Sequence, residues 1–214
     1  MWYNNRSLEA VIFIERSDHA DNYAMTFTES LLETKLMTGE ELMALGDIGP
    51  CELIEGRVTV VSPTKPRHGR YEYRLARAIG TFVDEQDLGE VQVGEVGLYI
   101  RRNPDTIRAA DLLFISHERL ARATPDSFLD VAPELVAEIL SPDDRWSQVK
   151  EKLNQYFEIG VVVVLIVNPN ERTVSVYRSP DDVQQFGEND VLSVEEVLPG
   201  FYLALIDLFR PDQK

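Results

Sequence analysis

The sequence predicts an α/β fold in which a mixed β-sheet is flanked by helices, and three observations support this prediction. Short apolar runs with the alternation of strands follow one another from residue 52 onward. Two longer segments, 68–84 and 142–159, instead repeat apolar residues at helical spacing. The second of these lies between two strand-like runs, 134–140 and 161–167, and therefore predicts a parallel crossover beside a β-meander.

The N-terminal half is expected to form a short helix, a hairpin and the first long helix. Thr38 and Glu41 have the spacing of a capping box, which predicts a short helix directly after Thr38. Residues 52–61 predict two strands joined by a tight turn at Glu55–Gly56, and a loop then leads to the helix at 68–84. Further strands are expected at 91–93, 97–101 and 107–115, followed by a short helical turn at 118–123.

The C-terminal half is expected to begin with the strand 134–140. Ser141 as a cap and Pro142 at the first helical position predict that a helix starts there, and Gly160 predicts its end. The β-branched run 161–167 is typical of a central strand covered on both faces. The remaining elements are expected to be an outer strand at 173–178, a closing segment at 191–197, a turn at Pro199–Gly200 and a short amphipathic end at 203–209.

Length and composition fit a globular protein with one full-sized core. The chain has 214 residues, of which 44% are hydrophobic, and we expect residues 25–214 to form a single domain. Residues 1–24 show no sustained period, which leaves two interpretations: a disordered tail, or an over-extended reading frame with Met25 as the true start. No apolar run approaches the roughly 20 residues of a membrane-spanning helix, and no export signal is present. We therefore expect a cytoplasmic protein without a membrane partner.

Charge and metal-binding residue types narrow the function classes. The formal net charge of −16 argues against nucleic-acid binding, since affinity for phosphate comes largely from Lys and Arg. The single cysteine, Cys51, and only three histidines argue against Cys-based and His-rich metal sites. The local exception to the acidic balance is a row of arginines along one face of the helix at 68–84, with His68 beside it: Arg67, Arg70, Arg74 and Arg77. Such a row is either a solvated helix face or a phosphate-binding surface.

Two acidic residues lie inside apolar strand-like runs. Asp111 lies within 108–116, and Glu138 lies within 133–141. A carboxylate in a packed apolar setting costs several kcal/mol unless it is paired or binds a metal. A divalent cation shared by the two residues would remove this cost and their mutual repulsion. The pair is therefore our candidate metal site, and the alternatives are an ordinary edge acid at Glu138 and an exposed strand entrance at Asp111.

The helix that follows Glu138 carries two lysines, Lys150 and Lys152, at the borders of its apolar stripe. Either can reach over the sheet, and periodicity does not choose between them. Asp, Glu and Lys around a shared point form the core of a metal-dependent phosphodiester-cleaving site. Taken alone, each lysine is more typical of a solvated surface.

Seven short segments of the chain form a recognisable ordered set, although none is specific alone. They are Glu52-Leu-Ile-Glu-Gly, Ser62-Pro-Thr-x-x-x-His-Gly, Gly94-Glu-Val-Gly, Arg108-Ala-Ala-Asp, Ala132-Pro-Glu-Leu-Val-Ala-Glu-Ile-Leu-Ser-Pro, Lys152-x-x-x-Tyr-x-x-x-Gly and Val197-Leu-Pro-Gly-Phe. In this order, over about residues 36–209, the chain resembles the Uma family of bacterial restriction-endonuclease-like proteins. That family is similar to the PD-(D/E)xK nuclease superfamily.

The resemblance implies a restriction-endonuclease-like mixed sheet flanked by helices, with an N-terminal helical and hairpin extension. It implies Mg²⁺, or Mn²⁺, held by Asp111, Glu138 and the carbonyl of Ile139. Leu140 stands where the superfamily has its catalytic lysine, and Ala110 where it has proline. The spacing of the Lys-x-x-x-Tyr-x-x-x-Gly segment selects Lys152 as the replacement lysine, and the resemblance also implies Glu55 as an additional catalytic acid.

The implied function is a Mg²⁺-dependent endonuclease that hydrolyses phosphodiester bonds of DNA. The arginine row, with His68, would hold the nucleic-acid backbone, and a homodimer is expected because dimers are common among such nucleases. The alternative is a catalytically inactive nuclease-fold module that acts in protein interaction or regulation. The acidic charge and the displaced lysine favour this alternative.

Overall fold

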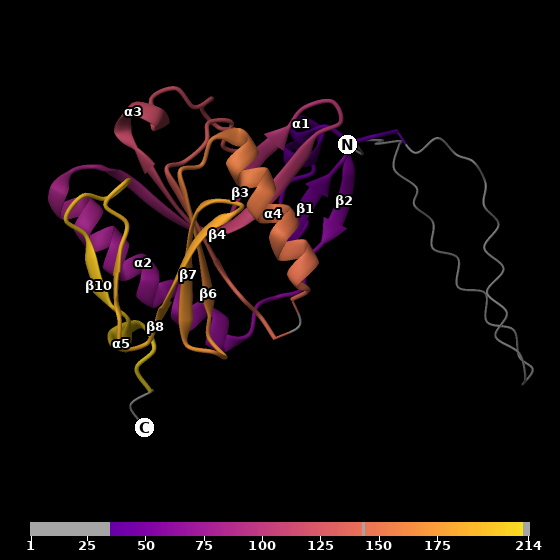
Figure 1. The fold of residues 1–214 in the computed structure, drawn as a ribbon. Helices are drawn as coiled ribbons and strands as arrows, with labels where there is room; N and C mark the ends of the chain where they lie inside the picture. Colours follow the sequence, from indigo (N-terminus) through magenta and orange to yellow (C-terminus); the bar gives the residue numbers. More distant parts are fainter. Residues whose placement is uncertain (1–34, 143, 212–214) are drawn as a thin grey trace, which may run out of the picture. The chain divides into compact units, whose positions relative to one another are not determined.

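The computed structural model describes residues 35–142 and 144–211 (Figure 1). Its helices and strands, in chain order, are α1 (Gly39–Ala44), β1 (Cys51–Ile54), β2 (Arg57–Val60), α2 (Pro66–Gln86), β3 (Gly89–Arg101), β4 (Thr106–Ser116), α3 (His117–Leu120), β5 (Leu135–Ile139), α4 (Trp146–Ile159), β6 (Val163–Asn168), β7 (Thr173–Ser179), β8 (Asp182–Gly187), β9 (Val191–Ser193), β10 (Tyr202–Ala204) and α5 (Leu205–Leu208). No helix among these residues is long and apolar enough to cross a membrane.

The strands form one eight-stranded mixed sheet and a separate two-stranded sheet. The large sheet has the order β2-β1-β4-β5-β6-β7-β8, and β3 pairs with β4 outside this path. β5 and β6 are parallel and are joined through α4, whereas the other neighbours in the large sheet are antiparallel. The predicted mixed α/β fold and its crossover are therefore confirmed.

The two long helices cover opposite faces of the large sheet, with α4 in front of it and α2 behind it in Figure 1. α2 buries Leu75 and Ile79 in one core cluster with Leu112 of β4. α4 buries Leu153 and Tyr156 in another cluster, which includes Leu113 and Val164 of the sheet. Burial of these apolar faces fixes each helix against the sheet, and the functional side chains at the helix borders are positioned by this packing.

One edge of β4 carries a gap between two strands. β3 and β1 both pair with Ile107, so they must lie on opposite edges of β4. β5 pairs with residues 112–114 of β4, which are also paired with β3, so β5 shares the edge occupied by β1. Residues 108–111 therefore lie between β1 and β5 without a registered strand partner on that edge.

The regular alternation of β4 is interrupted at the same place. Ala110 and Leu113 pack in the cluster on the α4 side, whereas Leu112 packs on the α2 side. Asp111 lies within this interruption, opposite a register shift in β3 between Val93 and Val96. Such a shift re-aims side chains, and here Asp111 is buried with its Oδ2 3.1 Å from His68 Nε2 of α2.

Several predicted elements are confirmed and others are corrected. The capping box at Thr38 and Glu41, the tight turn before Gly56 and the αL end of α4 at Gly160 are all present. The two strands expected at 91–93 and 97–101 are one bulged strand, β3, and the closing segment 191–197 contains the short strand β9. The exposed strand β8 was not predicted. Interpretations of residues 1–24 fall outside the described residues.

The predicted start of α4 at Ser141–Pro142 is wrong. The helix begins at Trp146, and its N-cap residue Arg145 makes no side-chain capping hydrogen bond. Asp144 instead closes a turn, because its carboxylate accepts a hydrogen bond from the Ser141 N–H at 2.7 Å while its own N–H donates to the Ser141 carbonyl at 3.1 Å. Local side-chain bonding of this kind competes with helix formation.

Two glycines, one within α2 and one at the start of β3, should respond to alanine in opposite directions. Gly89 has φ +152°, and an added Cβ would lie 2.1 Å from the Ile115 carbonyl oxygen, so Gly89→Ala should lower the free energy of unfolding by about 2 kcal/mol or more. Gly80 lies within α2 with its nearest atom 4.0 Å from such a Cβ, so Gly80→Ala should raise it by up to about 1 kcal/mol. Urea unfolding measures both changes, and a neutral Gly89→Ala would contradict the described packing of β3 on β4.

Candidate active site

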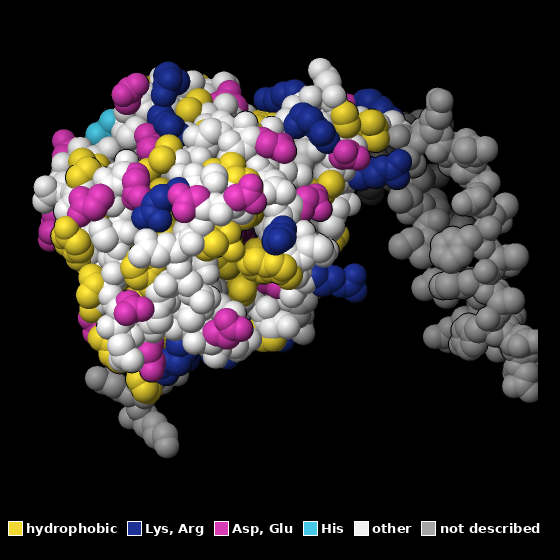
Figure 2. Space-filling view, viewed as in Figure 1, with side chains coloured by type: hydrophobic (Ala, Val, Ile, Leu, Met, Phe, Trp, Pro, Cys, Tyr) yellow, Lys and Arg dark blue, Asp and Glu magenta, His cyan; other side chains and the backbone are white. Residues whose placement is uncertain are grey.

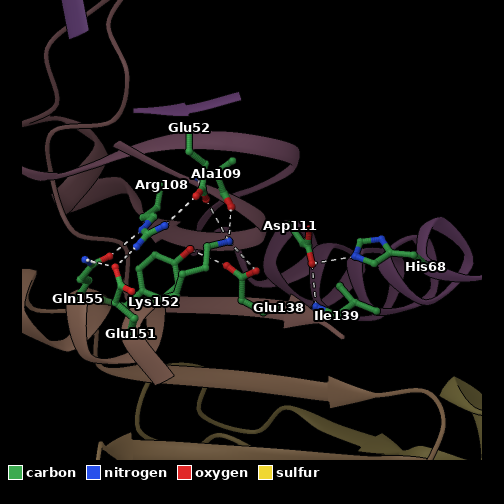
Figure 3. A network of polar contacts seen from close by, with 11 residues as sticks. Glu52, His68, Arg108, Ala109, Asp111, Glu138, Ile139, Glu151, Lys152 and Gln155 are labelled. Carbon is green, nitrogen blue, oxygen red and sulfur yellow. Dashed lines mark hydrogen bonds and ion pairs between the residues drawn. The ribbon is translucent and has the colours of Figure 1, made fainter. Parts of the chain in front are cut away.

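Side chains fill the gap along the edge of β4. The Ala109 N–H donates to Glu52 Oε1 at 3.1 Å, and the Ala109 carbonyl accepts from Lys152 Nζ at 2.9 Å (Figure 3). Buried backbone groups require hydrogen-bond partners, and no strand supplies them at this point of the edge. A glutamate from β1 and a lysine from α4 therefore take the place of the missing strand.

Lys152 lies at the centre of this arrangement. Its Nζ lies 3.0 Å from Glu138 Oε2 and 3.3 Å from Glu52 Oε1, in addition to its bond with the Ala109 carbonyl. The ammonium group thus donates two hydrogen bonds, to Ala109 and Glu138, and forms an ion pair with Glu52. Burial acts to lower the pKa of Lys152, but the charges of Glu138 and Glu52 outweigh it and raise this pKa above its ordinary value. Lys152 is therefore charged at neutral pH.

Glu138 faces α4, as strand alternation after Val136 requires. Both of its oxygens accept hydrogen bonds, Oε2 from Lys152 and Oε1 from the Tyr156 hydroxyl at 2.5 Å. Burial raises the pKa of Glu138 to about 7, the charge of Asp111 adds to this increase, and Lys152 offsets only part of it. Ionised Glu138 is therefore costly in the metal-free protein, although it has two donors.

Asp111 lies beside Glu138 at the point where two strands separate. Leu112 pairs with Ala137, and Asp111 and Glu138 are the next residues of β4 and β5 beyond that pair. Asp111 Oδ2 accepts from the Ile139 N–H at 2.7 Å and lies 3.1 Å from His68 Nε2. Its other oxygen, Oδ1, accepts no hydrogen bond from any part of the chain that the structure describes.

His68 reaches Asp111 from the first turn of α2. Its side chain is buried, and its Nδ1 lies 3.9 Å from Glu72 Oε2 without a hydrogen-bond partner in the described ranges. Burial acts to lower the pKa of His68, but its bond to Asp111 and the charges of Asp111 and Glu72 raise it on balance. His68 thus lies between two carboxylates, one of which belongs to the candidate metal pair.

Arg108 ties the gap to α4 and was not singled out from the sequence. Its guanidinium contacts Glu52 at 2.8 Å, Glu151 at 2.5 Å and Gln155 at 2.7 Å (Figure 3). Glu52 was also missed as a candidate site residue. Burial acts to raise the pKa of Glu52, but Lys152 and Arg108 outweigh it, so this pKa lies below its ordinary value. Glu52 is therefore ionised between two cations.

The structure brings together most of the predicted site residues. Asp111, Glu138, Lys152, the backbone of Ile139 and His68 meet at the gap (Figure 3). Of the two lysines left open by periodicity, Lys150 is exposed. Glu55 lies in the β1–β2 turn, is 66% exposed and pairs with Arg101 at 2.9 Å. The geometry thus gives Glu55 no place beside Lys152, and Glu52 occupies that position.

Two arginines of the row on α2 donate hydrogen bonds to carbonyl groups and a side chain of other segments. Arg67 donates to the Asn170 side chain and the Pro169 carbonyl, and Arg74 donates to the carbonyls of Leu208 and Arg210. These two arginines hold the protein's own loops. Arg67, Arg70 and Arg77 are exposed, and contact of the row with nucleic acid stays a prediction.

The donor set fits a magnesium ion better than a structural zinc ion. Among the described residues, no group of three or more His, Cys, Asp or Glu side chains is arranged to hold an ion. Mg²⁺ keeps several waters and is typically held by one or two carboxylates together with substrate phosphates. Asp111 and Glu138 are two neighbouring carboxylates, and an ion beside them would offset the cost of ionising Glu138.

Comparison with known proteins identifies the family. The sequence model of the Uma2 family, described as "putative restriction endonuclease", matches residues 40–206, and the chain belongs to this family. No curated protein matches. Among solved structures, the chain is similar to a protein from Anabaena variabilis described as "a putative nuclease belonging to DUF820". The TM-score is 0.68 at 22% identity, with 81% of this chain and 97% of that chain covered, and this likeness supports the nuclease-like fold.

Two acids of the same hairpin should differ in their effect on stability. Glu52→Ala leaves Arg108 and Lys152 without a shared buried partner, so we expect the free energy of unfolding to fall by about 3 kcal/mol. Glu55→Ala removes an exposed ion pair and should change it by about 1 kcal/mol or less. Urea unfolding at pH 7 in EDTA tests the comparison, and equal losses would contradict the described network.

Glu138→Gln should flatten the pH dependence of stability in the metal-free protein. The pKa of Glu138 is about 7 in the folded state and ordinarily about 4.5, so the folded state binds more protons between these values. The free energy of unfolding of the wild-type protein should therefore fall as pH rises through this window. Glu138 should account for up to about 3 kcal/mol of this fall. Unfolding at pH 5 and pH 8 in EDTA measures the effect, and the same pH dependence in both proteins would refute it.

Proposed function

We propose that this member of the Uma2 family is a metal-dependent endonuclease that hydrolyses phosphodiester bonds of DNA. One observation carries the proposal: Lys152 of α4 places its Nζ 3.0 Å from Glu138 Oε2, beside Asp111. A lysine from the helix thus supplies the charge that Leu140, two residues after Glu138, cannot supply. Asp111, Glu138 and Lys152 therefore lie close together, although the lysine belongs to α4 and not to β5.

Asp111 and Glu138 would bind Mg²⁺, or Mn²⁺, through carboxylate oxygens, with the Ile139 carbonyl as a further donor. When bound, the ion would polarise the phosphate and lower the pKa of a water molecule. His68 and the Ile139 N–H both contact Oδ2 of Asp111. These two contacts orient the carboxylate, and its other oxygen, Oδ1, would be the metal ligand. The protein thus supplies orientation as well as charge.

Lys152 would stabilise the negative charge that develops on the phosphate in the transition state. The raised pKa of Lys152 keeps the side chain protonated. Its three contacts restrict the side chain to one conformation before substrate binds. The exposed Arg70 and Arg77 on α2 would contact the nucleic-acid backbone. The expected homodimer stays a prediction that analytical ultracentrifugation tests.

The acidic character of the chain favours a second candidate, a nuclease-fold module that binds a protein partner without catalysis. The net charge is −16, and in Figure 2 acidic and basic side chains are interspersed over the face shown. Such a surface offers little long-range attraction for DNA. Metal binding and cleavage together decide between the two candidates.

Purified protein should cleave DNA in Mg²⁺ or Mn²⁺ and lose this activity in EDTA. Asp111→Asn, Glu138→Gln and Lys152→Met should each lower the cleavage rate by about a hundredfold or more, because each removes a charge from the reacting centre. Lys150→Met, which removes an exposed lysine of the same helix, is the matched control and should leave the rate near that of the wild type.

Calorimetric titration with Mn²⁺ distinguishes a metal-dependent endonuclease from an inactive module. Binding that is lost in Asp111→Asn and Glu138→Gln supports the site. Cleavage that survives either of these changes would overturn the assignment. A wild-type protein that neither binds Mn²⁺ nor cleaves DNA would be the inactive module.

A further inference from the structure

We propose that Glu52 is a positioning residue that fixes the Lys152 ammonium group beside Glu138, an inference that rests on the proposed function. Glu52 belongs to β1, and its side chain is 12% exposed. Its carboxylate accepts from Arg108 at 2.8 Å and from the Ala109 N–H at 3.1 Å, and its Oε1 lies 3.3 Å from Lys152 Nζ. It therefore connects the lysine to both the side chains and the backbone of β4.

A lysine on α4 needs such a partner more than a lysine on β5 would. The lysine stem has four rotatable bonds, and holding it in one conformation costs side-chain entropy. Contacts from different directions reduce this freedom: Glu138 of β5, the Ala109 carbonyl of β4 and Glu52 of β1. Of the two carboxylates, Glu138 would also serve the metal ion, whereas Glu52 is left to hold the lysine.

Glu52 is itself held in place from the other side. Arg108 bridges Glu52 to Glu151 and Gln155, the residues one before and three after Lys152 on α4. Arg108 therefore sets the helix relative to β4 while it sets the Glu52 carboxylate. The strand β1, the edge of β4 and the helix α4 form one connected polar network around the lysine.

The contacts of Glu52 distinguish a positioning role from a catalytic one. Its oxygens contact Arg108, Lys152 and a backbone N–H, and none of these is a reacting atom. Loss of its charge should therefore misplace Lys152 while the metal pair remains intact. A small displacement of a catalytic group is enough to reduce turnover strongly.

The test compares Glu52→Gln with Glu40→Gln. Glu52→Gln keeps an oxygen for the Ala109 N–H, removes the charge, and puts an NH2 donor where Oε2 accepts from Arg108. Glu40→Gln removes the carboxylate of another Glu–Arg pair, with Arg102 at 2.6 Å, on the exposed surface. The first readout is the ¹⁵N NMR signal of the Lys152 side-chain ammonium, assigned with Lys152→Met. It should shift or broaden in Glu52→Gln and stay unchanged in Glu40→Gln.

The second readout is kinetic. In Glu52→Gln, kcat should fall roughly tenfold or more, while KM and the affinity for Mn²⁺ stay near wild-type values. In the double variant with Lys152→Met, the change at Glu52 should cause little further loss, because both act through the same group. If Glu52→Gln does not fold, Glu52→Asp replaces it and should shift the Lys152 signal in the same way.

An unchanged Lys152 signal together with an unchanged kcat in Glu52→Gln would overturn the proposal. A fall in Mn²⁺ affinity equal to the fall in kcat would also overturn it, since Glu52 would then act on the metal pair. A wild-type protein without cleavage activity would refute the proposed function alone. In that case the NMR comparison still decides whether Glu52 positions the lysine.

Discussion

The edge of β4 between β1 and β5 is the constraint on which the candidate site depends. Two strands share that edge without meeting, so Ala109 presents a backbone donor and an acceptor that no strand satisfies. Glu52 and Lys152 satisfy them instead. The charged side chains of Glu52 and Lys152 therefore lie at the level of the sheet, where apolar residues would be expected. The same gap that interrupts the sheet gathers the residues of the site.

The cationic side chains in this gap lie between carboxylates. Lys152 lies between Glu52 and Glu138, and Arg108 lies between Glu52 and Glu151, so each cation has a carboxylate on two sides. The exception to full compensation is Glu138, whose pKa is raised to about 7 by burial and by Asp111. A buried carboxylate whose ionised form is unfavourable is typical of functional sites, where residues needed for activity often lower the stability of the folded protein.

Sequence patterns predicted the parts of this arrangement that are local. The Thr38–Glu41 capping box and the Gly160 helix end depend on short-range contacts, and Asp111 and Glu138 stand out because their neighbours are apolar. Glu52 was missed because Glu52 and Glu55 look alike in one hairpin, and only the arrangement of β1 against β4 separates them. Arg108 and Tyr156 were missed for the same tertiary reason. The polar strand β8 lies at an edge of the sheet, where apolar alternation is not required.

We propose that the gap beside β4 places Asp111 and Glu138 around one divalent cation with Lys152 beside them. Anomalous X-ray diffraction from crystals of the wild-type protein with Mn²⁺ measures this most directly. An anomalous peak is expected within about 2.0–2.3 Å of oxygens from both carboxylates. The Lys152 ammonium is expected to stay next to Glu52. A peak elsewhere, or no peak at this pair at a saturating Mn²⁺ concentration, would contradict a metal site at Asp111 and Glu138.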